Sequence, residues 1–442
     1  MTRKKLSILK RMACFTLILV LCFSMAPPTF AELNSNGALL GTEANPPKAA
    51  ITKMLKLPVG TTTPAFSFEF EITQTGGITV PGLVNQTLSF GASSDKTMSP
   101  VDGVNSVYQE TPDIFAGVTW PAGGGEYEFR VKETHDNNPL IDDAFYKEEL
   151  IYSPAVYDVT VYTKEKENST TESYIFAIVT MVDTRDTDDG AGAGAKIDPS
   201  PGSVQGEYSG MIFTNEYSKK YNGTDPDNDT TFKLSKTVHG PDANPNEYFS
   251  FAVYITQPSV GVTAPTTEYY AYLMDETDTA MSFIPTENFT VGTIVGGTVG
   301  GGTLSTSSPQ FITFNSGDTI FVNLKHGQWF NFVGTHVGAR FLVIESGKLG
   351  YTPTCEITAY NRTSLISDTT ANNDLSTGPQ YLGDSDIMTQ NNKAAFMNTK
   401  AAGTIPTGIS VDDLPYVILI GTGLISLAGY VFFKSRKKAK II

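Results

Sequence analysis

Two sets of polar residues recur in the same order on the apolar faces of segments with a β-strand pattern. Each set holds a lysine, then a glutamate, then an asparagine: Lys53, Glu133 and Asn215, and again Lys236, Glu345 and Asn398. Successive side chains of a strand point to opposite faces, so these six residues share a face with their aromatic and aliphatic neighbours. A single lysine at a strand end usually reaches solvent. The ordered triple appears twice, however, which favours two buried sites with a function.

A buried lysine beside a buried acid can do covalent chemistry. Burial disfavours the charged form of both groups, so the amine loses its proton and the acid keeps its own. The neutral amine can attack the side-chain carbonyl of an asparagine while the acid polarises that carbonyl and shuttles protons as ammonia leaves. We therefore predict two isopeptide bonds, each with an assisting acid: Lys53 to Asn215 with Glu133, and Lys236 to Asn398 with Glu345. Asn391 and Asn392 are nearby alternatives to Asn398.

The elements that would carry these residues are β-strands. Runs of aromatic and β-branched residues lie between turn-forming residues, and no segment between the two chain ends shows a sustained helical period. Such runs are found at 66–72, 127–131, 157–162, 249–255 and 320–324. The length exceeds one ordinary domain, and a polar stretch at 218–231 divides it. We expect an all-β protein with two domains, at 46–220 and 228–400.

The N-terminal segment has the features of a secretory signal peptide. Basic residues precede an apolar stretch at 12–25, and small residues lead to a cleavage position after Ala31. We therefore exclude residues 1–31 from the fold. Of the three cysteines, only Cys355 lies outside this segment, so the exported chain can form no internal disulfide. A staple between lysine and asparagine needs no thiol.

The C-terminal segment, residues 404–442, combines a cleavable motif with a membrane anchor. The motif Thr404-Ile405-Pro406-Thr407-Gly408 precedes an apolar run at 414–433 and a basic tail at 434–442. The apolar run is long enough to cross a bilayer as a helix, and the basic tail resists translocation. We expect this segment to hold the chain at the membrane until it is cut.

Composition argues against several classes of function. The chain carries 46 acidic and 31 basic residues, a formal net charge of −15, which argues against nucleic-acid binding. The four histidines show no metal-binding spacing. Asp225, Asp227 and Asp229 begin like a calcium loop, but the turn glycine and the bidentate glutamate are replaced. No hydrolase pattern stands out, so we expect no metal, no cofactor and no enzyme beyond the autocatalytic bond formation.

The same residues resemble a known family, the isopeptide-stapled backbone pilins of Gram-positive bacteria, typified by the streptococcal T-antigen pilin. In the first half of the chain the resemblance is carried by Ile51-Thr52-Lys53, by Tyr127 to Glu133 and by Ile212-Phe213-Thr214-Asn215. In the second half it is carried by Leu234-Ser235-Lys236, by Val343-Ile344-Glu345 and by Phe396-Met397-Asn398. The sorting signal of that family, a variant of Leu-Pro-x-Thr-Gly, is similar to Ile405-Pro406-Thr407-Gly408 with Pro415 and Tyr416.

The resemblance implies a fold and a fate for the chain. The fold would be two tandem immunoglobulin-like β-sandwiches of the CnaB type, with isopeptide bonds that give mechanical and proteolytic stability. A sortase would cleave between Thr407 and Gly408 and pass Thr407 to a lysine of a neighbouring pilin subunit or to a cell-wall precursor. Lys196 is the expected acceptor lysine, and Lys164 is the alternative. The protein would be a structural pilin subunit on the cell surface; the alternative is a monomeric wall-anchored adhesin for a host or environmental ligand.

Overall fold

The computed structural model describes residues 33–402, apart from 136–137, 187–190, 223–230, 263–267, 283–300, 361, 369–371 and 385–391. All regular elements in these ranges are β-strands, so the all-β prediction is confirmed for this part of the chain. The described residues include no helix with the length and apolar character needed to cross a bilayer. The signal peptide, the sorting motif and the membrane segment all fall outside the described residues, as do the three aspartates at 225–229.

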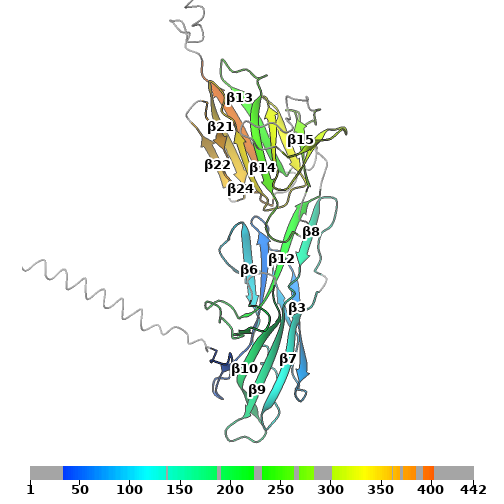
Figure 1. The fold of residues 1–442 in the computed structure, drawn as a ribbon, viewed down its shortest axis with the longest axis vertical. Coiled ribbons are helices and arrows are strands. Elements are labelled where there is room, and N and C mark those ends of the chain that lie inside the picture. The colour runs from blue at the N-terminus through cyan, green and yellow to red at the C-terminus, as the bar shows by residue number, and fades with distance from the viewer. Residues whose placement is uncertain are drawn as a thin grey trace, which may run out of the picture.

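The first half of the chain forms two sheets (Figure 1). The larger has the order β1-β10-β9-β7-β3-β4, with β11 beside β10. Its strands are β1 (Leu39–Leu40), β3 (Ser67–Gly76), β4 (Gln86–Ser89), β7 (Gly125–Glu133), β9 (Val156–Glu165), β10 (Ser173–Thr184) and β11 (Lys196–Ile197). The smaller has the order β5-β6-β2-β12-β8. Its strands are β2 (Ile51–Pro58), β5 (Lys96–Thr97), β6 (Val104–Glu110), β8 (Tyr146–Ile151) and β12 (Met211–Tyr221).

The second half forms two more sheets. The larger has the order β16-β17-β15-β19-β13-β25-β21-β22. Its strands are β13 (Phe232–His239), β15 (Glu268–Met274), β16 (Thr303–Leu304), β17 (Phe311–Asn315), β19 (Trp329–Val333), β21 (Tyr351–Ala359), β22 (Arg362–Ser367) and β25 (Lys393–Lys400). The smaller has the order β18-β14-β20-β23, with β24 beside β20. Its strands are β14 (Phe249–Thr256), β18 (Thr319–Leu324), β20 (Arg340–Glu345), β23 (Leu375–Ser376) and β24 (Gln380–Tyr381).

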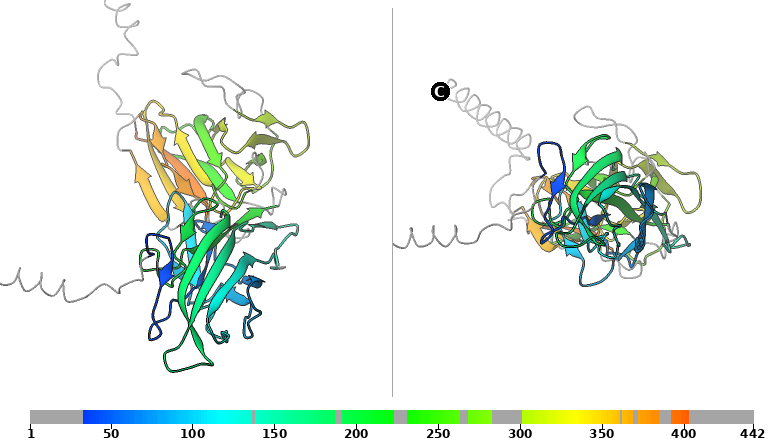
Figure 2. Two further views of the ribbon diagram at one scale, coloured as in Figure 1. Left: turned by 60° about the horizontal axis from the view of Figure 1, so that its bottom comes forward. Right: turned by 90° about the horizontal axis from the view of Figure 1, so that it is seen from below.

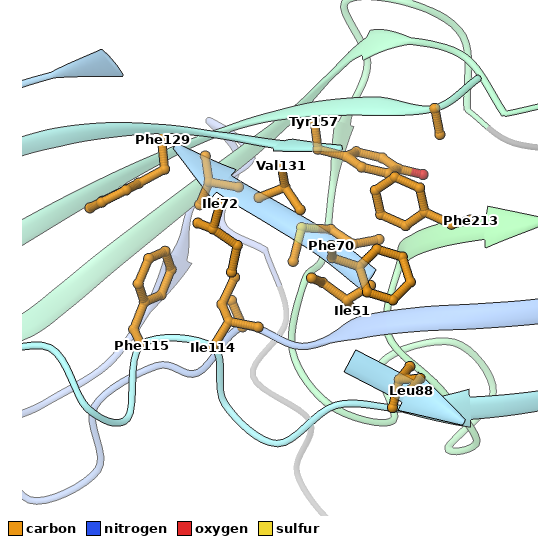
Figure 3. Close-up of a cluster of buried hydrophobic side chains, with 14 of the residues drawn as sticks. Ile51, Phe70, Ile72, Leu88, Ile114, Phe115, Phe129, Val131, Tyr157 and Phe213 are labelled. Carbon is orange, nitrogen blue, oxygen red and sulfur yellow. The ribbon is translucent and has the colours of Figure 1, made fainter. Parts of the chain in front are cut away.

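Each half has its own hydrophobic core between its two sheets. Strand β7 shows how the sequence builds the first one: its side chains alternate between buried and exposed, from Tyr127 through Phe129 and Val131 to Glu133. Figure 3 shows Phe129 and Val131 in this cluster together with Ile51 and Phe213 from the other sheet. Burying a large apolar side chain contributes about 1.5–3 kcal/mol. That alternation therefore fixes which face of β7 turns inward.

The first and last long strands of each half lie side by side and run parallel. Strand β2 pairs with β12, and β13 pairs with β25; all other strand pairs in the described ranges are antiparallel. In both halves the parallel pair sits inside a sheet, with a strand on either side. The beginning and the end of each half are thus neighbours in space, although they are far apart in the sequence.

The two halves meet end to end at the C-terminal end of β12 (Figures 1 and 2). The Tyr221 backbone nitrogen donates to the Thr335 carbonyl oxygen at 3.0 Å, and the Lys219 ammonium lies 3.2 Å from an Asp384 carboxylate oxygen. Gly338 has φ +74°, and a Cβ atom there would lie 2.4 Å from Cβ of Pro58, so this close approach requires glycine. The division into domains at 46–220 and 228–400 stays a prediction, and the first sheet also includes β1, which precedes residue 46.

Candidate functional site

The first predicted triad lies together in the core. Lys53 on β2 and Asn215 on β12 belong to one sheet, and Glu133 at the end of β7 reaches them from the facing sheet. The Lys53 Nζ atom lies 2.8 Å from Glu133 Oε1 and 2.9 Å from Glu133 Oε2. The Asn215 Nδ2 atom donates to Glu133 Oε1 at 2.9 Å. Lys53 and Asn215 are fully buried and Glu133 is 6% exposed.

The second predicted triad has the same construction. Lys236 on β13 and Asn398 on β25 share a sheet, and Glu345 at the end of β20 comes from the facing sheet. The Lys236 Nζ atom donates to Glu345 Oε1, and the Asn398 Nδ2 atom donates to the same oxygen at 3.0 Å. All three side chains are buried. The chain thus contains two copies of one arrangement.

The strand register places lysine and asparagine identically in both copies. Lys53 lies opposite Phe213, and Asn215 follows two residues later on the same face of β12. Lys236 lies opposite Phe396, and Asn398 follows two residues later on β25. A long lysine side chain can reach this diagonal neighbour. Because a shift of one residue would turn the asparagine to the other face, the parallel register decides whether the two groups can meet.

Burial sets the protonation of these groups. Desolvation lowers the pKa of Lys53 to about 8, against the attraction of the Glu133 carboxylate, which raises it. Desolvation likewise lowers the pKa of Lys236 to about 8, opposed by Glu345. The pKa values of both glutamates are raised, again mainly by desolvation. Burial therefore shifts both lysines towards the neutral amine and both glutamates towards the protonated acid.

Two aromatic pairs that the sequence analysis did not assign to the sites lie beside the triads. The Nζ atom of Lys53 lies 4.5 Å from the ring centroid of Phe68, and that of Lys236 lies 4.2 Å from the ring centroid of Phe249. Two residues further along, Phe70 pairs with Glu133, and Phe251 pairs with Glu345. The repeated Phe-x-Phe at 68–70 and 249–251 is the sequence signal for this apolar lining.

The alternative residues lie elsewhere. Asn392 is buried, but its side chain bonds to the backbone of Gly383 and Thr231, away from the second triad; Asn391 lies outside the described residues. Lys196 is exposed on β11, where its Nζ atom donates to the Asn36 carbonyl oxygen. Lys164 is exposed near the end of β9 and stacks on Phe176. In the described ranges, no group of three or more His, Cys, Asp or Glu side chains is arranged to hold a metal ion.

This geometry suits attack of a lysine amine on an asparagine carbonyl. The acid touches both the amine that attacks and the amide nitrogen that leaves, so it can move a proton from one to the other. We expect the rate of bond formation at both sites to rise as the pH is raised towards about 8, because protonated lysine is not a nucleophile. Mass spectrometry during refolding at a series of pH values would measure this rate, and a rate that does not change across that range would contradict the prediction.

Comparison with known proteins gives a family match and structural neighbours. A family described as a domain of unknown function (DUF7601) matches residues 230–400. No curated protein matches the chain. Among solved structures, the major pilin of Streptococcus pyogenes is 16% identical with a TM-score of 0.29, and the match covers 81% of this chain and 99% of that chain.

Two further structures are of the same kind. The T3.2 major pilin of Streptococcus pyogenes is 14% identical, with a TM-score of 0.26 and coverage of 80% and 98% of the two chains. A pilus-presented adhesin is 10% identical, with a TM-score of 0.21 and coverage of 80% and 100%. All three matches have identities of 16% or less and TM-scores of 0.29 or less.

Proposed function

We propose that this protein is a structural pilin or pilin-like subunit of a Gram-positive cell surface, stapled internally by two isopeptide bonds. The observation that carries the proposal is the repeated triad. Two buried lysines each contact a buried glutamate that also binds an asparagine, with one register in both copies. Burying a charged lysine and a charged glutamate at each of the two sites is costly. A covalent bond to the asparagine would remove the lysine charge, which gives a reason for these residues to lie in the core.

The proposal extends to how the subunit is attached. A sortase cleaves between Thr407 and Gly408 and transfers Thr407 either to a lysine of the next subunit or to a cell-wall precursor. The sorting motif at 404–408, the apolar run and the basic tail support this step. Lys196 is the proposed acceptor because its side chain is exposed on a two-residue strand at the edge of the first sheet. The processed protein is then held on the cell surface.

The mass of the exported chain tests the staple directly. Residues 32–407, expressed without the two terminal segments, should be lighter than their sequence by two ammonia molecules. Digestion should yield two cross-linked peptide pairs, one containing Lys53 and Asn215 and the other Lys236 and Asn398. An intact mass equal to that of the unmodified chain would contradict the proposal.

A further inference from the structure

The amide oxygen of Asn215 is already held by a hydrogen bond. The Ser153 backbone nitrogen donates to Asn215 Oδ1 at 2.7 Å, and this contact is buried. Ser153 lies in the connection between β8 and β9 and precedes Pro154. A residue before proline is restricted to extended conformations, so this short connection presents the Ser153 N–H group in a fixed direction.

Asp186 ties this connection to β12. Its Oδ1 atom accepts from Ser153 Oγ at 2.6 Å, and its two carboxylate oxygens lie 3.2 and 3.0 Å from the Thr214 backbone nitrogen. Asp186 is 7% exposed and Ser153 is 3% exposed. One buried carboxylate thus fixes both the donor at Ser153 and the strand position next to Asn215.

We propose that the Ser153 backbone amide is an oxyanion hole for bond formation between Lys53 and Asn215, and that Asp186 is the residue that positions it. This inference rests on the isopeptide bond proposed above and adds the group that stabilises its transition state. The Ser153 N–H group already donates at 2.7 Å to the ground-state amide oxygen, the atom on which the negative charge would develop.

In the first triad, the reaction replaces the Cγ–Nδ2 bond of Asn215 with a bond from Cγ to the Lys53 nitrogen. The Lys53 amine attacks Cγ of Asn215, and the carbonyl electron pair moves onto Oδ1, where the Ser153 N–H group stabilises the negative charge. Glu133 donates its proton to Nδ2 and accepts the proton that the Lys53 nitrogen loses. The carbonyl re-forms, the Cγ–Nδ2 bond breaks and ammonia leaves. A surface hollow lined in part by Glu133 and Ser153 offers it a way out.

The second triad differs from the first in this respect. Among the described residues, Asn398 Oδ1 and Glu345 Oε2 have no hydrogen-bond partner. The residue types and the strand register are matched between the two sites, although Lys53 contacts both Glu133 oxygens and Lys236 contacts only Oε1 of Glu345. Losing one oxyanion donor typically slows a reaction by about 10²–10³-fold. The Lys53–Asn215 bond should therefore form faster than the Lys236–Asn398 bond.

Refolding kinetics of residues 32–407 test this, with the second site as a control in the same molecule. Unbonded chain is diluted from denaturant, and cross-linked peptides for each bond are counted by mass spectrometry over time. Ser153→Pro removes the N–H group and should slow the first bond by about a hundredfold, while the pH at half-maximal rate and the rate of the second bond stay unchanged. Ser153→Ala keeps the N–H group but loses the Oγ contact with Asp186, so its rate should fall between those of wild type and Ser153→Pro.

Two substitutions of Asp186 carry the test independently, even if Ser153→Pro does not refold. Asp186→Asn keeps the acceptor for Ser153 and should retain the rate of the first bond. Its pH profile should shift to lower pH, because the Asp186 charge raises the pKa of Lys53. Asp186→Ala should form the first bond more slowly at every pH. If wild type, Ser153→Pro and Asp186→Ala formed the first bond at equal rates, the oxyanion-hole inference would be wrong and the proposed function would stand. If wild type formed neither bond, the proposed function itself would be wrong.

Discussion

Replacement of Glu133 by glutamine should leave the first staple unformed and lower the free energy of unfolding of the first half by about 4–5 kcal/mol. The estimate comes from the chain entropy of the unfolded state, because the bond closes a loop from Lys53 to Asn215 as a disulfide would. Glutamine keeps the shape of the side chain but cannot exchange a proton between the amine and the amide nitrogen. Urea unfolding followed by fluorescence and by limited proteolysis would measure the loss.

The control for this variant is Glu128→Gln. Glu128 lies on the same strand, but its side chain is exposed on the opposite face. This change should keep both bonds and alter the free energy of unfolding by less than about 0.5 kcal/mol. The Glu345→Gln variant should behave like Glu133→Gln at the second site. If Glu133→Gln matched its control in mass, Glu133 would not be the assisting acid; if it lacked the first bond but unfolded like its control, the first staple would have no part in the stability of the protein.

Replacement of Thr407 by alanine should abolish covalent attachment of the protein in the cells that produce it. The sortase would lose the residue through which it forms its thioester intermediate, so no acceptor amine could be joined. Cell-wall extracts separated in sodium dodecyl sulfate would show neither a ladder of high-mass species nor a single wall-bound species. Wall-bound protein in the Thr407→Ala strain would show that another residue makes the attachment.

Replacement of Lys196 by arginine separates fibre growth from wall anchoring. Arginine keeps the positive charge but is not an amine nucleophile, so the ladder should disappear while a single wall-bound species remains. Lys164→Arg, at an exposed position on β9, is the matched control and should keep the ladder. A single wall-bound species in wild type would instead favour the monomeric adhesin.

The positions of the triad residues could be predicted from the sequence because strand geometry is regular. Alternation places Lys53 with Ile51 and Leu55, and it places Glu133 with Val131. On β7 this parity gives the inward direction, whereas on β2 both faces are buried. Because lysine, glutamate and asparagine recur in the same order in both halves, Lys53 and Lys236 could be distinguished from ordinary lysines at strand ends. Parity does not separate Asn398 from Asn392, because both share the parity of Phe396; the contact of Asn398 with Glu345 decides between them.

The supporting groups could not be predicted in the same way. Ser153 and Asp186 lie in connections between strands, where no period indicates direction, and they lie 62 and 28 residues from Asn215 and Thr214 in the sequence. Their roles depend on how the two sheets close over each other. The parallel pairing of β2 with β12 likewise depends on strand order, which the pattern of a single strand does not contain. Phe68 and Phe249 could be predicted as core residues from the strand pattern. Their contacts with the lysines depend on how the two sheets of each half face each other.

The parallel pairing of the first and last strands determines how far the bonded protein could extend. In both halves the asparagine follows its lysine by 162 residues. A cross-link at these positions takes the chain between them out of the path along which tension passes. Fully extended at about 3.4 Å per residue, each bypassed segment would otherwise lengthen the chain by roughly 500 Å. When the two ends of the chain are pulled, only the short stretches before Lys53, between Asn215 and Lys236, and after Asn398 remain free to lengthen, so the bonded chain would be nearly inextensible until a covalent bond breaks.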